Sequence, residues 1–242
     1  GSLKNKAISW IDLGFFSIQP SEFAKIIIII WLSCYYDKHQ EHLNKYGTVL
    51  YPILISVVIA GLIFAQPDLG TTIIYSFIVA TIFFMAPISK EIRNKVLWII
   101  MGGIVIMSLV LVGGGSSLLT ERQKERFDFS NPCSTEKFYG KGNQVCNGYI
   151  AINNGKLLGV GLGNSTQKYL YLPEAHTDFI FAAFGQCFGF IGTTFILLLC
   201  LLLDIYLCKI AYATKNKKDR FVVIGIIAML LYQQLQNTGM IV

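Results

Sequence analysis

The sequence predicts an all-α membrane protein, a polytopic bundle of transmembrane helices that carries one long extracellular loop. Of its 242 residues, 54% are hydrophobic and only 14% are charged, whereas an average soluble domain has roughly 25% charged residues. The apolar residues also gather into runs about as long as a bilayer is thick. These runs argue against a soluble helical core, because the helices of such a core would carry a polar stripe.

Basic residues predict the orientation of these runs. Three short loops, residues 37–47, 88–95 and 209–220, carry several Lys or Arg side chains each and are therefore expected on the cytoplasmic side. By alternation, the long loop of residues 113–177 lies outside. We expect a single domain over residues 1–242 with six membrane segments, at about residues 20–36, 48–65, 72–86, 96–112, 179–208 and 221–242.

The net charge of +6 is explained by these loops and does not indicate nucleic-acid binding. No basic patch interleaved with aromatic residues occurs, which is the pattern that single-strand binders use. The chain starts in a loop at Gly1 and stops inside an apolar run at Val242. We therefore expect it to be a stretch of a longer protein.

The first membrane helix is expected to begin at Pro20, since proline is favoured in the first turn of a helix. Glu22 follows in that turn, where a carboxylate meets the positive end of the helix dipole. Glu22 and Lys25 are three residues apart and therefore share a face. Two interpretations stay open: a self-contained ion pair at the helix start, or structural support close to the functional site.

The second apolar run ends at the sequence QPDLGT, residues 66–71. A proline, an aspartate and a glycine this close together interrupt a helix, and at membrane depth such a break must be buried in protein or line a wet cavity. We expect a tight turn in which Asp68 caps the next helix. Gln66 and Asp68 would then face the same outer cavity as Asp178.

The six cysteines fall into two groups. Cys133 and Cys146 lie in the polar loop and can form a disulfide if that loop faces an oxidising exterior. No CxxC spacing occurs, which argues against a zinc site. The other four lie in apolar runs, where a cysteine usually acts as a small hydrophobic residue: Cys34, Cys187, Cys200 and Cys208.

The stretch from Gly159 to Gly192 is the expected functional site, because it is polar up to Asp178 and then turns into a long apolar run. An acidic group at the mouth of a membrane segment is costly to desolvate and usually has a function. Partial desolvation there would strengthen Asp178 as a general base. The alternative is an N-cap formed by Thr177 and Asp178, which does not exclude catalysis. Asp204 lies too far along the same helix to join Asp178.

Phosphate binding is a second possibility for the long loop. The segment GVGLGN, residues 159–164, resembles a glycine-rich phosphate loop only superficially, since no strand of a βαβ unit precedes it. A backbone nest for another phosphate and a flexible surface turn both stay open. Lys168 and Arg126 are cations suited to clamp a phosphate. The charged segment around Arg126 has a plainer alternative, a solvated amphipathic helix.

Five stretches resemble, in this order and spacing, the SEDS family (shape, elongation, division and sporulation), and they are closer to the FtsW-like division branch than to RodA. They are WIDLGFFSIQPSEFAK, QPDLGT, RFDFSNP, GNQVCNGYIAINNGKLLGVGLGNSTQKYLYLPEAHTDFIFA and NTGMIV. The resemblance spans essentially the whole chain, and LPEAHTDFIFA is its most specific part. The spacing of Cys133 and Cys146 is similar to that of versions from Gram-positive bacteria.

The resemblance implies a peptidoglycan glycosyltransferase that polymerises lipid II at the outer face of the bacterial cytoplasmic membrane. Asp178 matches the family's essential acidic residue and is implied to be the general base, with undecaprenyl pyrophosphate as the leaving group. A divalent cation, Mg²⁺ or Mn²⁺ held by Asp178, is the cofactor to consider. Implied partners are a class B penicillin-binding protein and other divisome or elongasome proteins. The substrate-binding residues that we assign are Arg126, Gln144, Lys168, Glu174 and His176.

One departure from the family pattern bears on function. Members usually carry an acidic pair, GEELG, where this chain has GQCFG at residues 185–189. The neutral Gln186 keeps open a catalytically silent scaffold that recruits the transpeptidase. A lipid II flippase is the other alternative, although the polar residues gather at the outer face rather than along a path across the membrane.

Overall fold

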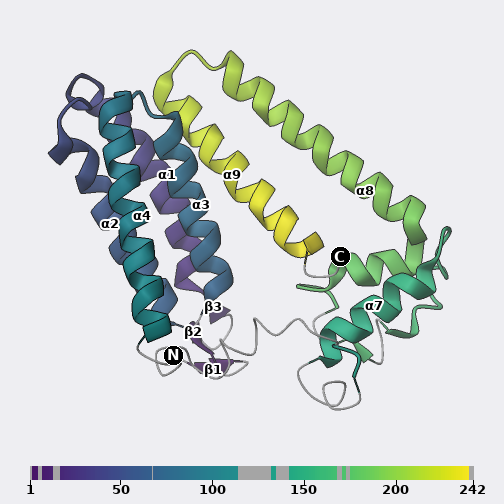
Figure 1. Cartoon of the computed structure of the whole chain (residues 1–242). Helices are drawn as coiled ribbons and strands as arrows, with labels where there is room; N and C mark the ends of the chain where they lie inside the picture. Colours follow the sequence, from purple (N-terminus) through teal and green to yellow (C-terminus); the bar gives the residue numbers. More distant parts are fainter. Residues whose placement is uncertain are drawn as a thin grey trace. The chain divides into compact units, whose positions relative to one another are not determined.

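The computed structural model describes residues 2–4, 7–12, 17–66, 68–113, 132–134, 142–167, 171–172 and 175–239. These residues form helices and a small sheet (Figure 1), and their contacts define two compact units. The first unit combines Gly1–Phe127 with Leu207–Leu230, and the second combines Asp128–Tyr206 with Leu231–Val242.

A small antiparallel sheet precedes the first helix, which the all-α prediction did not include. Strand β2 (Ala7–Asp12) lies between β1 (Ser2–Lys4) and β3 (Ser17–Ile18). Ser2 pairs with Trp10 in one ladder, and Ile11 pairs with Ile18 in the other. Such short strands carry too little periodicity to be found in a sequence, because their stability depends on pairing with one another.

The helices of the first unit follow the predicted membrane segments. Three of them, α1, α2 and α3, contact one another (Figure 1) and alternate in direction because short connections join them. The helices in chain order are α1 (Pro20–Lys38), the 3-10 turn η1 (Gln40–His42), α2 (Tyr46–Ala65), α3 (Leu69–Met85) and α4 (Lys90–Gly113).

The core of the first unit lies between α1 and α3. Each helix buries one stripe of residues spaced three or four apart, and α9 (Lys217–Gly239) packs against both stripes through Gly225. A Cβ atom added at Gly225 would lie 2.7 Å from Ile29 of α1 and 3.1 Å from Ile82 of α3. The two stripes include Ile28, Ile29, Leu32 and Tyr36 on α1, and Ile74, Tyr75, Ile78 and Ile82 on α3.

The second unit is built around the contact between α7 (Asn143–Gly155) and the first part of α8 (Ile180–Ala213). Small side chains let the two helices approach closely, so that Ala151 of α7 lies in one buried cluster with residues at the start of α8. That cluster consists of Ala151, Leu172, Ala175, Phe179, Ala182 and Ala183.

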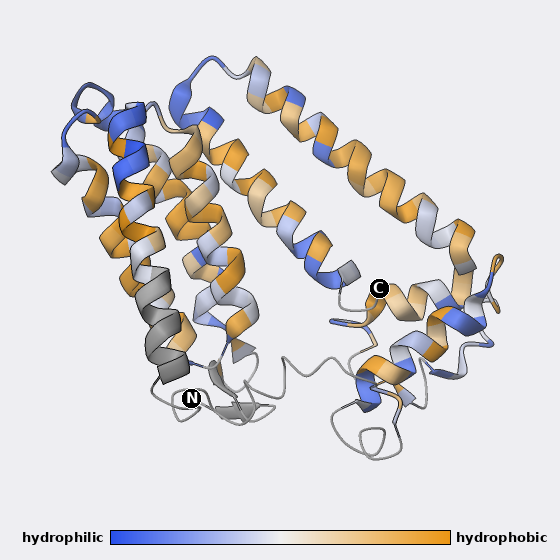
Figure 2. Ribbon diagram, viewed as in Figure 1, coloured by the Kyte–Doolittle hydropathy of each residue, from blue (hydrophilic) through white to orange (hydrophobic). Residues whose placement is uncertain are grey.

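Three of the described helices, α2, α8 and α9, are long and apolar enough to cross a membrane, and α3 is a shorter apolar helix of 17 residues. Figure 2 shows the apolar character along α2, α3 and α8, and hydrophilic residues where α1 passes to α2 and where α8 passes to α9. The helices begin or end up to about a turn and a half beyond the predicted spans, as at Lys90 and Ala213. A helix continues into the headgroup layer, where an apolar run already ends.

Candidate functional site

Helix α8 is interrupted nine residues after its start. Gly189 has φ 66° and ψ −165°, which is not helical. A continuous α8 of 34 residues would be about 50 Å long, well above the roughly 30 Å of a bilayer core. The break therefore separates a short helical segment, residues 180–188, from a membrane-length segment, residues 190–213.

The loop after α7 inserts into this break and completes the backbone hydrogen bonds there. The N–H groups of Val160 and Gly161 donate to the carbonyls of Gln186 and Cys187, at 2.9 and 3.0 Å. In the other direction, the N–H groups of residues 190 and 191 donate to the carbonyls of residues 156 and 157, at 2.9 and 3.2 Å. In an unbroken helix, residues 190 and 191 would donate to residues 186 and 187. Four loop bonds thus replace two helical ones.

Two glycines make this insertion sterically possible. Gly159 has φ 82°, and a Cβ atom there would lie 2.2 Å from the carbonyl oxygen of Cys187. A Cβ atom at Gly189 would lie 2.4 Å from the backbone nitrogen of Gly159. Both positions require a left-handed backbone and a close backbone approach, which glycine alone permits.

These contacts correct both interpretations of the segment GVGLGN. Its first three N–H groups are not arranged as a phosphate nest, because Gly159 donates to Gly155 and the next two donate to α8. Residues 159 and 160 do not form a flexible surface turn either, because they are only partly exposed and their N–H groups are bonded to α7 and α8. Residues 161–164 are exposed, so the surface location predicted for them is correct. The segment is a structural insert that supports α8.

A buried side-chain pair joins the same two segments. The hydroxyl of Ser165 donates to Oε1 of Gln186 at 2.6 Å, and each residue is 1% exposed. An amide buried this completely is stable only when it is hydrogen-bonded. The neutral Gln186 therefore has a structural partner in Ser165.

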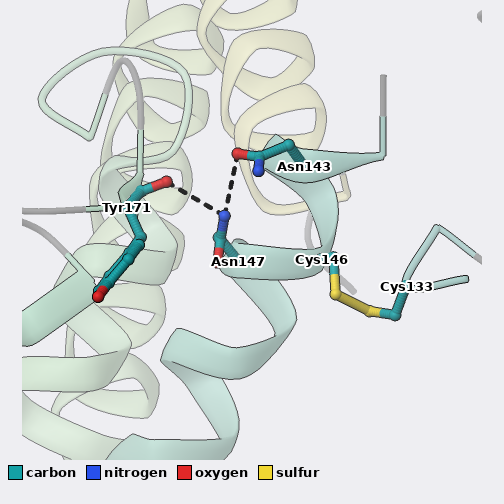
Figure 3. The surroundings of a disulfide bond; sticks show 5 residues. All are labelled: Cys133, Asn143, Cys146, Asn147 and Tyr171. Atoms are coloured by element: carbon teal, nitrogen blue, oxygen red, sulfur yellow. Dashed lines mark hydrogen bonds between the residues drawn. A yellow bond between two sulfur atoms is a disulfide. The ribbon is translucent and has the colours of Figure 1, made fainter. Parts of the chain in front are cut away.

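Helix α7 is held at its first turn by a disulfide and an amide network (Figure 3). Cys133 and Cys146 are bonded, with their Cα atoms 5.1 Å apart. On the next residue, the buried Asn147 donates from Nδ2 to Oδ1 of Asn143 at 3.0 Å and to the carbonyl of Tyr171 at 3.1 Å. The second bond ties α7 to the segment that leads to Asp178.

Breaking the disulfide is expected to loosen the start of α7. The bond closes a short loop, with a sequence separation of 13, and its loss should lower the free energy of unfolding of the second unit by about 2–4 kcal/mol. Thiol labelling with and without reductant reports whether the two cysteines are bonded. Limited proteolysis of wild type and Cys133→Ser then measures how far the start of α7 is loosened. Cys208→Ser, which removes an exposed free cysteine, serves as the control. Labelling of both cysteines without reductant would contradict the bond.

Asp178 lies in the turn of residues 175–179, immediately before α8. Ala175 and Phe179, at the two ends of this turn, are buried in the α7–α8 cluster. The turn is therefore anchored at both ends while residues 176–178, including His176, are exposed. Within the second unit Asp178 is exposed, so its predicted desolvation is not seen there.

The first unit contains the other predicted polar residues. Lys25 is 1% exposed, and its ammonium lies 2.8 Å from Oε1 of the half-exposed Glu22. Asp68 caps α3 as predicted: its carboxylate accepts from the N–H and the hydroxyl of Thr71, at 3.1 and 2.7 Å, and from Gln19 at 2.7 Å. The last contact links the starts of α1 and α3. Gln66 is partly exposed at the end of α2.

Removing the Asp68 carboxylate is expected to destabilise the first unit by about 1–3 kcal/mol, since a helix cap and a link between helices are lost together. Thermal unfolding of Asp68→Ala in detergent measures this change. Asp68→Asn keeps one acceptor oxygen and should fall between alanine and wild type. Equal stability of Asp68→Ala and wild type would show that these hydrogen bonds contribute nothing.

Several predicted residues cannot be placed by the geometry. Arg126, Lys168 and Glu174 lie outside the described residues, so the phosphate clamp stays a prediction. Gln144 is exposed on the first turn of α7. Among the described residues, no group of three or more His, Cys, Asp or Glu side chains could hold a metal ion. A divalent cation held by Asp178 together with substrate phosphates, the arrangement usual for Mg²⁺, stays a prediction.

The sequence prediction missed Asn147, Ser165 and the insertion of the loop into α8. A signal was present, because glycines recur in two segments about thirty residues apart in the chain. They are Gly155, Gly159 and Gly161 in the first segment, and Gly185, Gly189 and Gly192 in the second. Paired glycine clusters of this kind indicate close backbone approach, although not which groups meet.

The fold and the broken helix define a multi-pass helical membrane protein, as predicted. The chain belongs to the family described as cell cycle protein (FTSW_RODA_SPOVE), which it matches over residues 1–242, so the resemblance to the SEDS proteins is confirmed. Members of this family reside in the cytoplasmic membrane, which agrees with the predicted localisation.

Individual relatives are similar over nearly the whole chain. It is 35% identical to the probable peptidoglycan glycosyltransferase FtsW of Bacillus subtilis, covering 99% of this chain and 59% of that protein, with the same figures for its counterpart in Haemophilus influenzae. It is 36% identical to the stage V sporulation protein E of B. subtilis, covering 100% of this chain and 63% of that protein. The chain thus spans about three fifths of the length of these relatives.

Solved structures share the fold. One, described as "Structural coordination of polymerization and crosslinking by a peptidoglycan synthase complex", matches with a TM-score of 0.71 at 23% identity and covers 99% of this chain and 64% of that chain. The crystal structure of the rod shape determining protein RodA of Thermus thermophilus matches with a TM-score of 0.57 at 22% identity, covering 99% and 59%.

Proposed function

We propose that the full-length protein is a peptidoglycan glycosyltransferase that polymerises lipid II at the outer face of the cytoplasmic membrane, with Asp178 as the general base. The observation that carries the proposal is the placement of Asp178. It lies on an exposed turn fixed at both ends by buried residues, and the segment that follows is braced by the inserted loop. The names of the 35% identical relatives support the reaction class.

In the proposed reaction, the Asp178 carboxylate accepts the proton of the 4-hydroxyl of the acceptor N-acetylglucosamine. The oxygen forms a bond to C1 of the donor N-acetylmuramic acid with inversion. The bond between C1 and the pyrophosphate oxygen breaks, and undecaprenyl pyrophosphate leaves with the electron pair. Preorganised cations stabilise such developing charge, and Arg126 and Lys168 are proposed for this role. Gln144, Glu174 and His176 are proposed to bind the sugars.

The proposal includes a partner, a class B penicillin-binding protein that crosslinks the new strand. Its support is the likeness to a structure whose description names both polymerization and crosslinking. Other divisome or elongasome proteins remain proposed partners by family membership.

One observation favours a lipid II flippase as the second candidate. Asp204 lies within the membrane-length part of α8, is 6% exposed, and accepts a hydrogen bond from Gln234 of α9 at 3.3 Å. A buried carboxylate in a membrane segment is often part of a transport path. A catalytically silent scaffold that recruits the transpeptidase stays the third candidate, since Gln186 is neutral and is bonded to Ser165.

The test is polymerisation of purified lipid II by the full-length protein with its transpeptidase, wild type against Asp178→Asn. Polymer from wild type alone supports the enzyme with Asp178 at its centre. Equal polymer from both would overturn the assignment of the base. Polymer from neither, together with lipid II translocation in vesicles, would favour the flippase. A parallel arm with EDTA, then Mg²⁺ or Mn²⁺, measures whether a divalent cation takes part.

A further inference from the structure

We propose that Gln186 is a positioning residue for Asp178, and that it acts through its hydrogen bond with Ser165. This inference rests on the proposed function, since it assigns Gln186 a part in the reaction that Asp178 carries out. Gln186 itself is buried and so does not contact substrate.

The loop holds Gln186 at two points. Its carbonyl oxygen accepts from the N–H of Val160 at 2.9 Å, and its side-chain Oε1 accepts from the hydroxyl of Ser165 at 2.6 Å. Its neighbours Ala182, Ala183 and Cys187 are buried as well. In such surroundings a lost partner leaves a polar group unsatisfied, so breaking the bond is costly.

Because of the break at Gly189, the Ser165–Gln186 bond can affect the position of the Asp178 carboxylate. Because two helical hydrogen bonds are replaced by bonds to the loop, the short segment of residues 180–188 is not aligned by a continuous helix. Its orientation depends on the loop at its far end and on the α7–α8 cluster at its near end. Gln186 lies about two helical turns after Asp178, so a tilt of the segment at Gln186 moves the carboxylate at its start.

The chemistry of the pair explains why a neutral side chain suffices. Ser165 donates, and Gln186 needs only an acceptor oxygen at the end of a two-methylene chain. A glutamate has the same shape and also accepts, whereas leucine fills the space and cannot accept. The backbone bond from Val160 remains in every variant, so side-chain substitutions isolate the Ser165–Gln186 contact.

The experiment measures kcat and KM for lipid II in the full-length protein with its transpeptidase, normalised to the folded fraction. Displacing a reacting group by about 1 Å costs up to 10²-fold in rate. We therefore expect Gln186→Leu to lower kcat by about 10- to 100-fold with KM within about threefold. Gln186→Glu should restore kcat to within about threefold of wild type, and Ser165→Ala should lose about tenfold.

The variants also test the pair itself. Ser165→Ala combined with Gln186→Leu should be no slower than Gln186→Leu alone, since both remove one contact. Wild-type kcat in Gln186→Leu, a change confined to KM, or additive losses in the double variant would each overturn the proposal. If Gln186→Leu does not fold, Ser165→Ala and Gln186→Glu decide it by the same criteria. Equal rates of wild type and Asp178→Asn would instead overturn the proposed function and the assigned role of Gln186 with it.

Discussion

Asp178→Asn is expected to lower the rate of lipid II polymerisation by about 10²- to 10⁴-fold, the usual contribution of a positioned general base. Asparagine has the shape of aspartate but cannot accept the proton of the attacking hydroxyl. The exposed position of Asp178 on its anchored turn makes the substitution compatible with folding. The loss should therefore fall on kcat, and thermal unfolding of the variant should match that of wild type.

Two comparisons make this result specific. Asp204→Asn changes a carboxylate within α8, which accepts a hydrogen bond from Gln234, and it should retain polymerisation if chemistry resides at Asp178 alone. Asp178→Glu keeps the carboxylate at the end of a longer side chain and should recover part of the rate. A rate for Asp178→Asn within about threefold of wild type would rule out general-base catalysis by this residue.

Gly159→Ala is expected to destabilise the second unit by at least about 3 kcal/mol. The new methyl group would lie 2.2 Å from a backbone oxygen of α8, and backbone atoms cannot rotate away as a side chain does. A left-handed conformation adds roughly 1–2 kcal/mol for any residue with a Cβ atom. If the loop withdraws to relieve the clash, the bonds from Val160 and Gly161 to α8 are lost, at about 1 kcal/mol each.

Gly163→Ala is the matched control, because a Cβ atom there meets nothing within 4 Å and the backbone is not left-handed. Thermal unfolding and protease sensitivity of the loop distinguish the two variants. Gly159→Ala should also lose most polymerising activity, since the support of the short α8 segment fails. Equal unfolding temperatures for the two alanine variants would contradict the insertion of the loop into α8.

The membrane bundle was predictable from local features of the chain. Apolar runs and basic loops located the long helices among the described residues, because hydropathy and loop charge are properties of one short segment at a time. The start of α1 at Pro20, the cap by Asp68 and the pairing of Glu22 with Lys25 likewise involve residues no more than three apart. The place of Asp178 just before α8 was predictable for a related reason, since the change from polar to apolar sequence marks the start of that helix.

The supporting framework of the site was not predictable in the same way. The bonds between residues 156–161 and 186–191 and the contact of Ser165 with Gln186 join segments that are far apart in the chain and have no shared periodicity. A glycine cluster records that two backbones approach, but not which carbonyl meets which N–H.

Hydropathy, charge and helix capping act over a few residues, so the class of protein and its long apolar helices could be predicted from the sequence. The catalytic role of Asp178 stays a prediction. The insertion of the glycine-rich segment into α8 and the burial of Gln186 as an acceptor for Ser165 could be seen only in the folded protein. The physical reason is that the hydrogen bonds of a broken helix must be completed by whichever segment lies against it, and that choice is made by packing.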